Sequence, residues 1–309
     1  MSALPALDWP AWRETALHLQ LMTQVVGKIR LALTPWVNHG WHVPLYVTSL
    51  GLGTSLVPSE AGPFEIELDL IDHQLVLRTS AGGKASLALR PGTIADFHAE
   101  LMAVLGGFGI AAPIVTLPNE MPDPVRFPED RAERPYDREA VHRFHAALAF
   151  TDAVFKQFRT AFLGKVSPVH FFWGSFDLAV TRFSGRPAPP HPGGVPGLPD
   201  AVTREAYSHE VSSAGFWPGN DSFPRPAFYS YAYPVPPGFG EASIPAPAYF
   251  NAELGEFLLD YDAVRAAADP AAMLTDFLES TYAVAADLGG WDRGALECTP
   301  GVPRRPRKV

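Results

Sequence analysis

Residues 167–219 read SPVHFFWGSFDLAVTRFSGRPAPPHPGGVPGLPDAVTREAYSHEVSSAGFWPG, and the rest of the chain is organised around them. This stretch contains an aromatic cluster, an alternating segment that carries Asp177, a stiff Pro/Gly-rich loop that holds His191, and a polar segment from Glu205 to Glu210. Binding and catalytic side chains often lie on loops that a rigid scaffold positions. We therefore expect a functional site here, although no motif in the stretch identifies a reaction.

The segments on both sides of this stretch have the periodicities of helices and strands. Apolar residues recur every three or four positions where a helix buries one face, and they alternate where a strand does. Phe64, Ile66 and Leu68 alternate with Glu65 and Glu67, which predicts a half-buried strand with an acidic outer face. By the same reasoning we expect helices over 8–27, 93–105, 137–162 and 271–288, and strands over 36–58, 64–70, 74–79, 86–89, 228–233 and 249–259.

The two halves of the chain share several features in the same order. Each starts with a long helix expected to end in Gly-Lys, continues through Thr/Ser-Pro to Leu-x-Val-Thr, and closes on a helix followed by Gly-Gly and an aromatic residue. The matching segments are Gly27-Lys28 with Gly164-Lys165, 34–35 with 167–168, 45–48 with 178–181, and 105–108 with 288–291. This order predicts an α+β fold of two tandem α-β-β-β-α pseudo-repeats, each with an antiparallel sheet backed by helices. The alternative is two unrelated halves whose helix ends share ordinary Gly chemistry.

Proline marks the expected domain boundaries. The chain has 32 prolines, and their clusters between periodic segments indicate ordered, stiff loops. We expect an N-terminal half over 1–117, a Pro-rich linker over 118–136, a C-terminal half over 137–299 with a long Pro-rich loop over 185–204, and a basic flexible tail over 300–309. Loops as long as 185–204 are usually functional or disordered in compact domains, and its prolines favour the functional interpretation.

Composition restricts the class of protein. A net charge of −9 argues against a nucleic-acid partner, because such a protein needs a basic face for phosphates. No run of apolar residues is long enough for a membrane span, and the N-terminus MSALPALDWPAW lacks the features of a secretory signal. The only cysteine, Cys298, has no partner for an internal disulfide. These features together fit a cytoplasmic protein.

Histidines and carboxylates suggest a metal or acid–base site, since the familiar catalytic motifs are absent. His170, His191 and His209 come from separate segments, as converging ligands do, and with Glu210, Glu205 or Asp177 they could hold iron, zinc or manganese. Alternatively, His209 is a general base that Glu205 or Asp177 orients. Asp177 lies on a small polar face of its expected strand, which either lines a cavity or faces water. The structural alternative for the histidines is ordinary turn capping and core packing.

Arginine and tryptophan residues are the candidate ligand contacts. Arg182 and Arg186 could clamp a carboxylate or phosphate, or else form surface ion pairs. Trp41, Trp173 and Trp217 could wall a pocket for a ring or sugar, or else fill the core.

Three strings carry a resemblance to a known family: VGKIRLALTPWVNHGWHVPLYVT (26–48), SPVHFFWGSFDLAVTRFSGRPAPPHPGGVP (167–196) and EAYSHEVSSAGFWPG (205–219). The chain resembles a bacterial conserved-domain family of unknown function from about Trp9 to Trp291. The resemblance implies a stand-alone, cytoplasmic bacterial protein and brings no activity, cofactor or catalytic residue.

Three functions are compatible with these observations. The first is a small-molecule enzyme, in one version assisted by a divalent metal, with its site in the 167–219 block near the junction of the halves. The second is a non-catalytic module that encloses an apolar or aromatic ligand. The third is a structural protein whose Pro-rich loops and aromatic side chains form a homo-oligomer interface.

Overall fold

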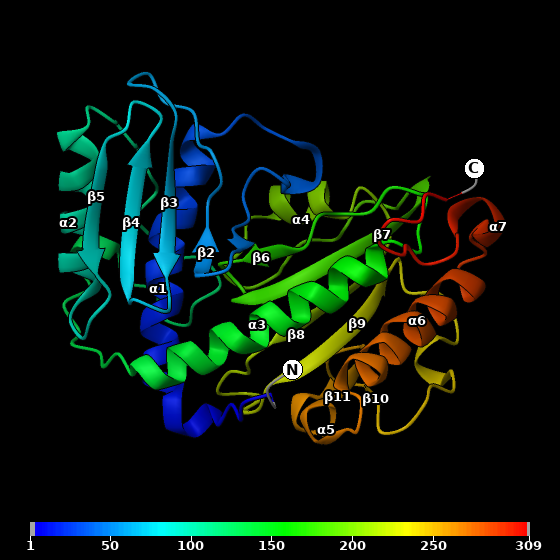
Figure 1. The fold of residues 1–309 in the computed structure, drawn as a ribbon. Helices are drawn as coiled ribbons and strands as arrows, with labels where there is room; N and C mark the ends of the chain where they lie inside the picture. The colour runs from blue at the N-terminus through cyan, green and yellow to red at the C-terminus, as the bar shows by residue number, and fades with distance from the viewer. Residues whose placement is uncertain (1–3, 308–309) are drawn as a thin grey trace.

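The computed structural model describes residues 4–307 and contains two antiparallel sheets backed by helices (Figure 1), so the α+β prediction is confirmed. The first sheet has five strands in chain order, and the second has six in the order β10-β11-β9-β8-β7-β6. Each sheet therefore has more strands than the three expected in each half. The first sheet consists of β1 (Tyr46–Val47), β2 (Gly51–Gly53), β3 (Phe64–Asp69), β4 (Gln74–Thr79) and β5 (Lys84–Ala88).

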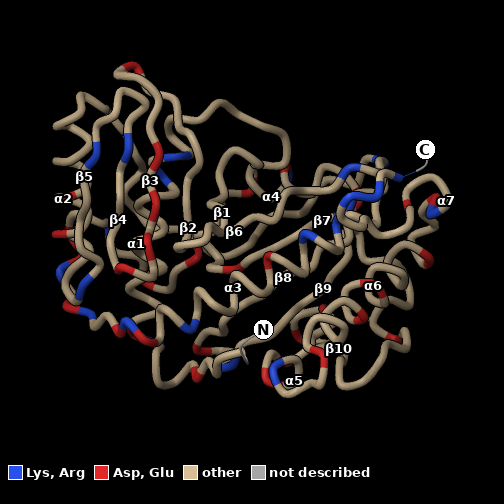
Figure 2. Tube along the Cα trace, in the orientation of Figure 1, with Lys and Arg blue, Asp and Glu red and all other residues tan. Residues whose placement is uncertain are grey.

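Strand β3 has the alternation that its sequence predicts. Phe64, Ile66 and Leu68 are buried, whereas Glu65 and Glu67 are half-buried on the opposite face. Arg78 of the neighbouring β4 lies 3.2 Å from Glu67 and 3.7 Å from Glu65. The acidic residues follow β3 as a red segment in Figure 2. One face of this sheet is therefore core, and the other is a charged surface.

Helices α1 (Trp9–Leu33) and α2 (Ile94–Gly107) accompany the first sheet. Pro10 stands in the first turn of α1, where its missing N–H is tolerated. The expectation that Gly27 ends this helix is wrong, because α1 continues to Leu33. Gly27 instead lies against the indole of Trp173, where a Cβ would come within 2.2 Å of the ring nitrogen. Close packing, and not helix termination, requires glycine at this position.

The second sheet has helices on one face, as the sequence predicts. Its strands are β6 (His170–Phe172), β7 (Asp177–Pro187), β8 (His209–Trp217), β9 (Ala227–Tyr233), β10 (Tyr249–Asn251) and β11 (Glu256–Asp260). Helices α3 (Arg138–Arg159) and α6 (Pro270–Leu288) pack on this sheet, and Figure 1 shows both crossing the same face. The residues beneath them are buried and mostly apolar: Leu178, Val180, Phe216, Phe228 and Leu259. The short helix α5 (Tyr261–Ala266) follows β11, and α7 (Arg293–Leu296) follows α6.

The two sheets meet at β6. Leu45 and Phe171 exchange two backbone hydrogen bonds of 2.9 Å, and Phe171 pairs on its other side with Leu178 of β7. The two Leu-x-Val-Thr segments that the sequence matches therefore lie on opposite sides of β6. Buried residues of both halves form one continuous core.

The second face of the six-stranded sheet is polar, and no long helix of residues 4–307 covers it. Asp177 and Thr181 of β7 point to the same side as Ser213 and Gly215 of β8, because the antiparallel register pairs 179 with 215 and 181 with 213. Tyr229 and Tyr231 of β9 continue this face. The Pro-rich loop, α4 (Asp200–Ala206) and part of the linker lie over it. The polar segment from Glu205 to Glu210 thus forms the end of α4 and the start of β8, which lies between β9 and β7 in the sheet.

The start of the C-terminal tail is docked on the end of α3. The Gly301 N–H donates to Thr160 Oγ1 over 2.8 Å, and Gln157 donates to the Gly301 carbonyl over 3.1 Å. The flexibility of the basic tail over 300–309 stays a prediction. Residues 308–309 of that tail lie outside the described residues.

Candidate functional site

Three carboxyl groups and three tyrosines gather on the polar face of the six-stranded sheet. We call this set the carboxyl–tyrosine site, and it consists of Glu120, Asp177, Tyr207, Tyr229, Tyr231 and Glu256. The residues come from the linker, β7, the end of α4, β9 and β11. Asp177 is buried and the other five are half-buried, so the set is open to solvent at its edge.

Asp177 is the innermost carboxyl group of the site. It begins β7 and is 6% exposed. The Tyr229 hydroxyl donates a hydrogen bond to Oδ2, whereas Oδ1 has no hydrogen-bond partner within residues 4–307. Burial raises the pKa of Asp177 to about 6, and the bond from Tyr229 acts in the opposite direction by stabilising the carboxylate. A buried oxygen without a partner costs free energy, so Oδ1 is a feature that needs a reason.

Gly215 allows Tyr229 to reach Asp177 from two strands away. The tyrosine ring lies over Gly215, where a Cβ would stand 2.2 Å from both Cζ and the hydroxyl oxygen. Glycine inside a strand commonly marks such a close approach. The local sequence of β8 therefore sets the position of a side chain on β9.

Glu120 enters the site from the Pro-rich linker. Its Oε1 lies against the backbone of Gly174, where a Cβ would come within 2.2 Å of it. Burial raises the pKa of Glu120 to about 7, and the negative charge of Asp177 adds to the shift. Glu120 is therefore largely protonated below neutral pH.

The residue before Glu120 fixes the linker against α1. The backbone N–H of Asn119 donates to Gln24 Oε1 over 2.7 Å, and Gln24 Nε2 donates to the Asn119 carbonyl over 2.9 Å. Lys28 donates to Asn119 Oδ1 over 2.5 Å, and burial lowers the pKa of Lys28 to about 8. The Glu120 N–H donates to the carbonyl of Gly197 in the Pro-rich loop over 3.2 Å. The linker thus holds α1, the loop and the site together.

Glu256 closes the site on the side of β11. It is the first residue of that strand and follows a turn at Gly255, whose φ is 72°. Burial raises the pKa of Glu256 to about 7, with a further contribution from the charge of Asp177. The site therefore contains three carboxyl groups whose pKa values lie between about 6 and about 7.

Tyrosines form the aromatic part of the site. The rings of Tyr229 and Tyr231 stack with centroids 6.0 Å apart and an interplanar angle of 17°. The hydroxyls of Tyr231 and Tyr207 share a hydrogen bond of 2.8 Å. His191 of the Pro-rich loop stacks on Tyr207 with centroids 5.0 Å apart. The tyrosine hydroxyls are therefore engaged with each other or with Asp177, while their rings cover the face of the sheet.

The turn that delivers Asp177 contains a backbone outlier. Phe176 has φ of 61°, in the left-handed region that bulky residues rarely occupy. Such a conformation costs about 1–3 kcal/mol and persists only where packing enforces it. Phe176 is 3% exposed and stacks on Phe144 with centroids 5.1 Å apart. Core packing thus holds the strained turn that orients the next residue, Asp177.

The predicted metal ligands do not converge. His170 is buried among the rings of Trp41, Tyr46 and Phe172, where burial lowers its pKa to about 3. His191 stacks on Tyr207, Glu210 pairs with Arg186, and the nearest ring to His209 is that of His39 at 5.4 Å. Across residues 4–307, no group of three or more His, Cys, Asp or Glu side chains is arranged to hold a metal ion. The positions of these residues give no support to the expected iron, zinc or manganese site.

Two of the predicted catalytic residues, Glu205 and His209, belong to a different cluster. Glu205 Oε1 accepts a hydrogen bond of 2.9 Å from the backbone N–H of His39, and Lys165 Nζ lies 2.5 Å from His39 Nε2. Burial lowers the pKa of His39, and the charge of Lys165 adds to the effect, so the ring is neutral and accepts from the ammonium. This cluster connects the 3-10 helix η1 (Asn38–Gly40) to α4. Asp177 contacts Tyr229 and does not orient His209.

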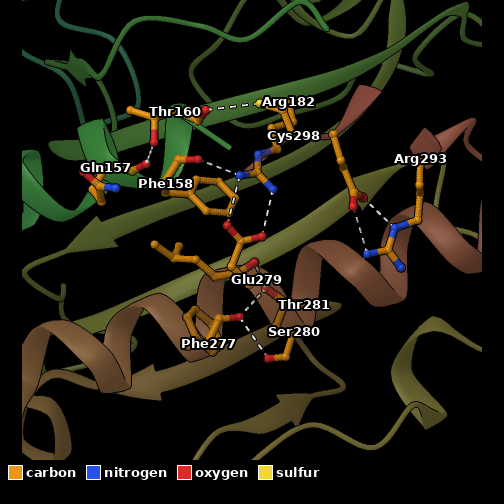
Figure 3. A network of polar contacts seen from close by, with 12 residues as sticks. Gln157, Phe158, Thr160, Arg182, Phe277, Glu279, Ser280, Thr281, Arg293 and Cys298 are labelled. Carbon is orange, nitrogen blue, oxygen red and sulfur yellow. Dashed lines mark hydrogen bonds and ion pairs between the residues drawn. The ribbon is translucent and has the colours of Figure 1, made fainter. Parts of the chain in front are cut away.

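Arg182 lies on the helix-covered face and not in the site. Its side chain is 1% exposed, its guanidinium donates two bonds of 3.1 Å to Glu279 of α6, and a third of 2.6 Å reaches the Phe158 carbonyl of α3. Figure 3 shows this network between the two helices. The guanidinium carbon is 3.4 Å from the centroid of the Phe158 ring. Arg182 therefore links α3 to α6, a position that agrees with the ion-pair alternative for this residue.

Arg186 and the three tryptophans also have structural positions. Arg186 donates to Glu210 and to the carbonyls of Gly289 and Gly290, which end α6. Trp173 donates to the Val43 carbonyl over 3.1 Å, Trp217 stacks on Phe223 at 5.7 Å, and Trp41 lies beside His39 and His170. The tryptophans do not face one common pocket. Two cavities of about 250 Å³ lie elsewhere, one beside His18 and the other beside Met273.

Sequence reasoning found Asp177 and missed the rest of the carboxyl–tyrosine site. The alternation FYSYAY over 228–233 places Tyr229 and Tyr231 on one face, and this was an available signal. Glu120 and Glu256 have no local signal, because each is an isolated carboxylate near a turn.

The fold and site together define an α+β protein with two helix-backed antiparallel sheets and a half-buried carboxyl–tyrosine site. The chain belongs to the family of unknown function DUF5996, whose model matches residues 4–298. No curated protein and no solved structure matches the chain. Within residues 4–307, no helix is both long and apolar enough to cross a membrane.

Proposed function

We propose that the protein is a small-molecule enzyme that uses general acid–base catalysis at the carboxyl–tyrosine site, with Asp177 as the group that exchanges a proton with the substrate. One observation carries the proposal. Three carboxyl groups from separate segments share one half-buried face, and their pKa values lie near neutrality. A catalytic acid or base works best when its pKa is near the working pH. Perturbed carboxyl groups of this kind cluster at functional sites.

The contacts of Asp177 suit the role of a base. The Tyr229 hydroxyl fixes Oδ2, so Oδ1 is the atom left to accept a proton. With a pKa of about 6, the group is mostly ionised at neutral pH and can return the proton later in the reaction. Burial and the charge of Asp177 raise the pKa values of Glu120 and Glu256 to about 7, so each can act as donor or acceptor. The exposed Ser175, two residues before Asp177, marks the side open to solvent.

A non-catalytic binding module is the alternative. The half-buried tyrosine rings favour it, because they offer a contact surface that needs no proton transfer. The metal-assisted version of the enzyme has less support, since the expected ligands lie apart.

Carbon-13 NMR titration of the aspartate and glutamate carboxyl groups tests the electrostatic basis. We expect Asp177, assigned through Asp177→Asn, to titrate near pH 6 and not near its ordinary value of about 4. Titration at the ordinary value would remove the argument for a base.

Turnover assays then test the enzyme itself. The wild type is compared with Asp177→Asn and with the control Glu253→Gln, an exposed residue of the β10–β11 turn, on a panel of esters, amides, glycosides and carbonyl compounds with exchangeable α-protons. We expect Asp177→Asn to lower kcat by about 10²–10⁴-fold and Glu253→Gln to leave it unchanged. Full activity of Asp177→Asn, or ligand binding by the wild type without turnover, would favour the binding module.

A further inference from the structure

The carboxyl–tyrosine site lacks a counter-charge. Among residues 4–307, no Lys, Arg or His forms an ion pair with Glu120, Asp177 or Glu256. Lys28, which holds the adjacent Asn119, donates to that amide oxygen and not to Glu120. Grouped negative charges inside a protein are costly unless a cation or a proton neutralises them.

Asp177 differs from the other buried aspartates of the protein. Asp130 pairs with Arg134 at 2.9 Å, and Asp152 pairs with Lys156 at 2.6 Å. Asp69 accepts two backbone N–H groups, from residues 71 and 72. Asp177 accepts a hydrogen bond from the Tyr229 hydroxyl at Oδ2, and Ser175 and its own backbone N–H also stabilise its charge, but its buried Oδ1 has no hydrogen-bond partner among the described residues. The site therefore has an acceptor that the fold leaves for something else.

The other groups of the site limit what that ligand can be. The hydroxyls of Tyr207, Tyr229 and Tyr231 are already engaged within the protein, so they offer ring faces and few free donors. An anion would meet three carboxyl groups without a donor, and a sugar needs donors as well as acceptors. A metal ion would need several ligands converging at bonding distance, and no such group is present in residues 4–307. An organic cation fits both the tyrosine ring faces and the carboxyl groups of the site, because ring faces attract cations and carboxylates neutralise their charge.

We infer that the carboxyl–tyrosine site binds an organic ammonium ion, held between the carboxylates of Glu120, Asp177 and Glu256 and the rings of Tyr229 and Tyr231. This inference rests on the location of the proposed active site and adds the class of its substrate. Its ammonium group would give Asp177 Oδ1 the partner that it lacks. The Pro-rich loop lies over the same face, through His191 on Tyr207 and the Tyr233 hydroxyl bonded over 3.0 Å to the Pro189 carbonyl, so it borders the bound ligand.

Titration calorimetry on the full chain tests the inference with choline, tyramine, putrescine and spermidine at pH 8 and pH 5. The matched neutral compound for choline is 3,3-dimethylbutan-1-ol, which has the same shape without the charge. We expect at least one of the four ammonium compounds to bind. If choline binds, the affinity of its neutral analogue should be at least about tenfold lower. For tyramine, the neutral compound for the same comparison is 4-ethylphenol. Affinity should fall at pH 5, where the three carboxyl groups take up protons, and should fall in Asp177→Asn but not in Glu253→Gln.

Several results would overturn the inference. The inference fails if none of the four ammonium compounds gives a binding heat. It also fails if charged and neutral analogues bind with equal affinity, or if Asp177→Asn binds the ammonium compounds as tightly as the wild type does. Binding of Mg²⁺ or Ca²⁺ that competes with the ammonium compounds and equals them in affinity would assign the site to an inorganic cation instead. If no ammonium compound binds yet Asp177→Asn abolishes turnover of an uncharged substrate, the proposed catalysis stands and only the substrate class fails. If ammonium compounds bind to the wild type and Asp177→Asn retains full turnover, the inferred ligand class stands and the proposed catalytic role of Asp177 fails.

Discussion

Glu120→Gln should make the protein more stable at alkaline pH, because Glu120 carries a charge that the fold accommodates poorly. Glutamine has the same shape and no charge at any pH. The pKa of Glu120 rises from 4.5 to about 7 on folding, and each unit corresponds to about 1.4 kcal/mol. The full shift would therefore be about 3 kcal/mol, and because the side chain is partly open to solvent we expect about 1–3 kcal/mol.

The sign of this effect follows from proton binding. Between about pH 4.5 and about pH 7 the folded state holds a proton that the unfolded state has released, so the free energy of unfolding falls as pH rises through this window. Above the folded pKa the cost is complete. Glutamine removes it, so the variant should match the wild type near pH 4 and exceed it at pH 8.

Urea unfolding followed by tryptophan fluorescence measures the difference at pH 4, 6 and 8. Glu253→Gln is the control, since an exposed substitution of this kind changes stability by no more than about 0.5 kcal/mol. The reasoning would be refuted if Glu120→Gln were no more stable than the wild type at pH 8, or if its advantage were equal at pH 4 and pH 8.

Three further substitutions test the packing that the site depends on. Gly215→Ala should destabilise the fold by about 1–3 kcal/mol by overpacking, since its Cβ would stand 2.2 Å from Tyr229, and a change below 0.5 kcal/mol in urea unfolding would contradict this. Arg182→Ala should cost about 1–3 kcal/mol, because it removes the charge-assisted hydrogen bonds that join α3 to α6, while the remaining Glu279 is 39% exposed and can be hydrated; a melting temperature equal to that of the wild type would argue against this role. Gly27→Leu should displace Trp173 from α1 and alter its fluorescence, whereas an unchanged emission maximum would show that the indole does not lie there.

Local pattern was sufficient for much of the fold. The alternation of Phe64, Ile66 and Leu68 with glutamates predicts β3 and its buried face, because side chains of a strand alternate with a period of two. Asp137 caps α3, with its carboxylate accepting the N–H groups of Glu139 and Ala140 in the first turn, as is usual for aspartate before a helix. Gly27 shows the limit of such reasoning, since a glycine next to lysine resembles a helix end and is in fact a packing contact with a distant tryptophan.

The sequence by itself determined the class of fold, the two antiparallel sheets with their helices, and the polar face on which Asp177 lies, because periodicity is a local property. Only the tertiary structure decided which groups share that face. Glu120 lies close enough to Asp177 for the two charges to interact because the linker folds over the sheet, and Glu256 does so because β11 lies beside β9 in the strand order. The tertiary structure also decided that Arg182 contacts α6 and that His170 packs against aromatic rings. Burial and mutual repulsion give the three carboxyl groups their chemistry, and both effects exist only after segments distant in sequence are brought together.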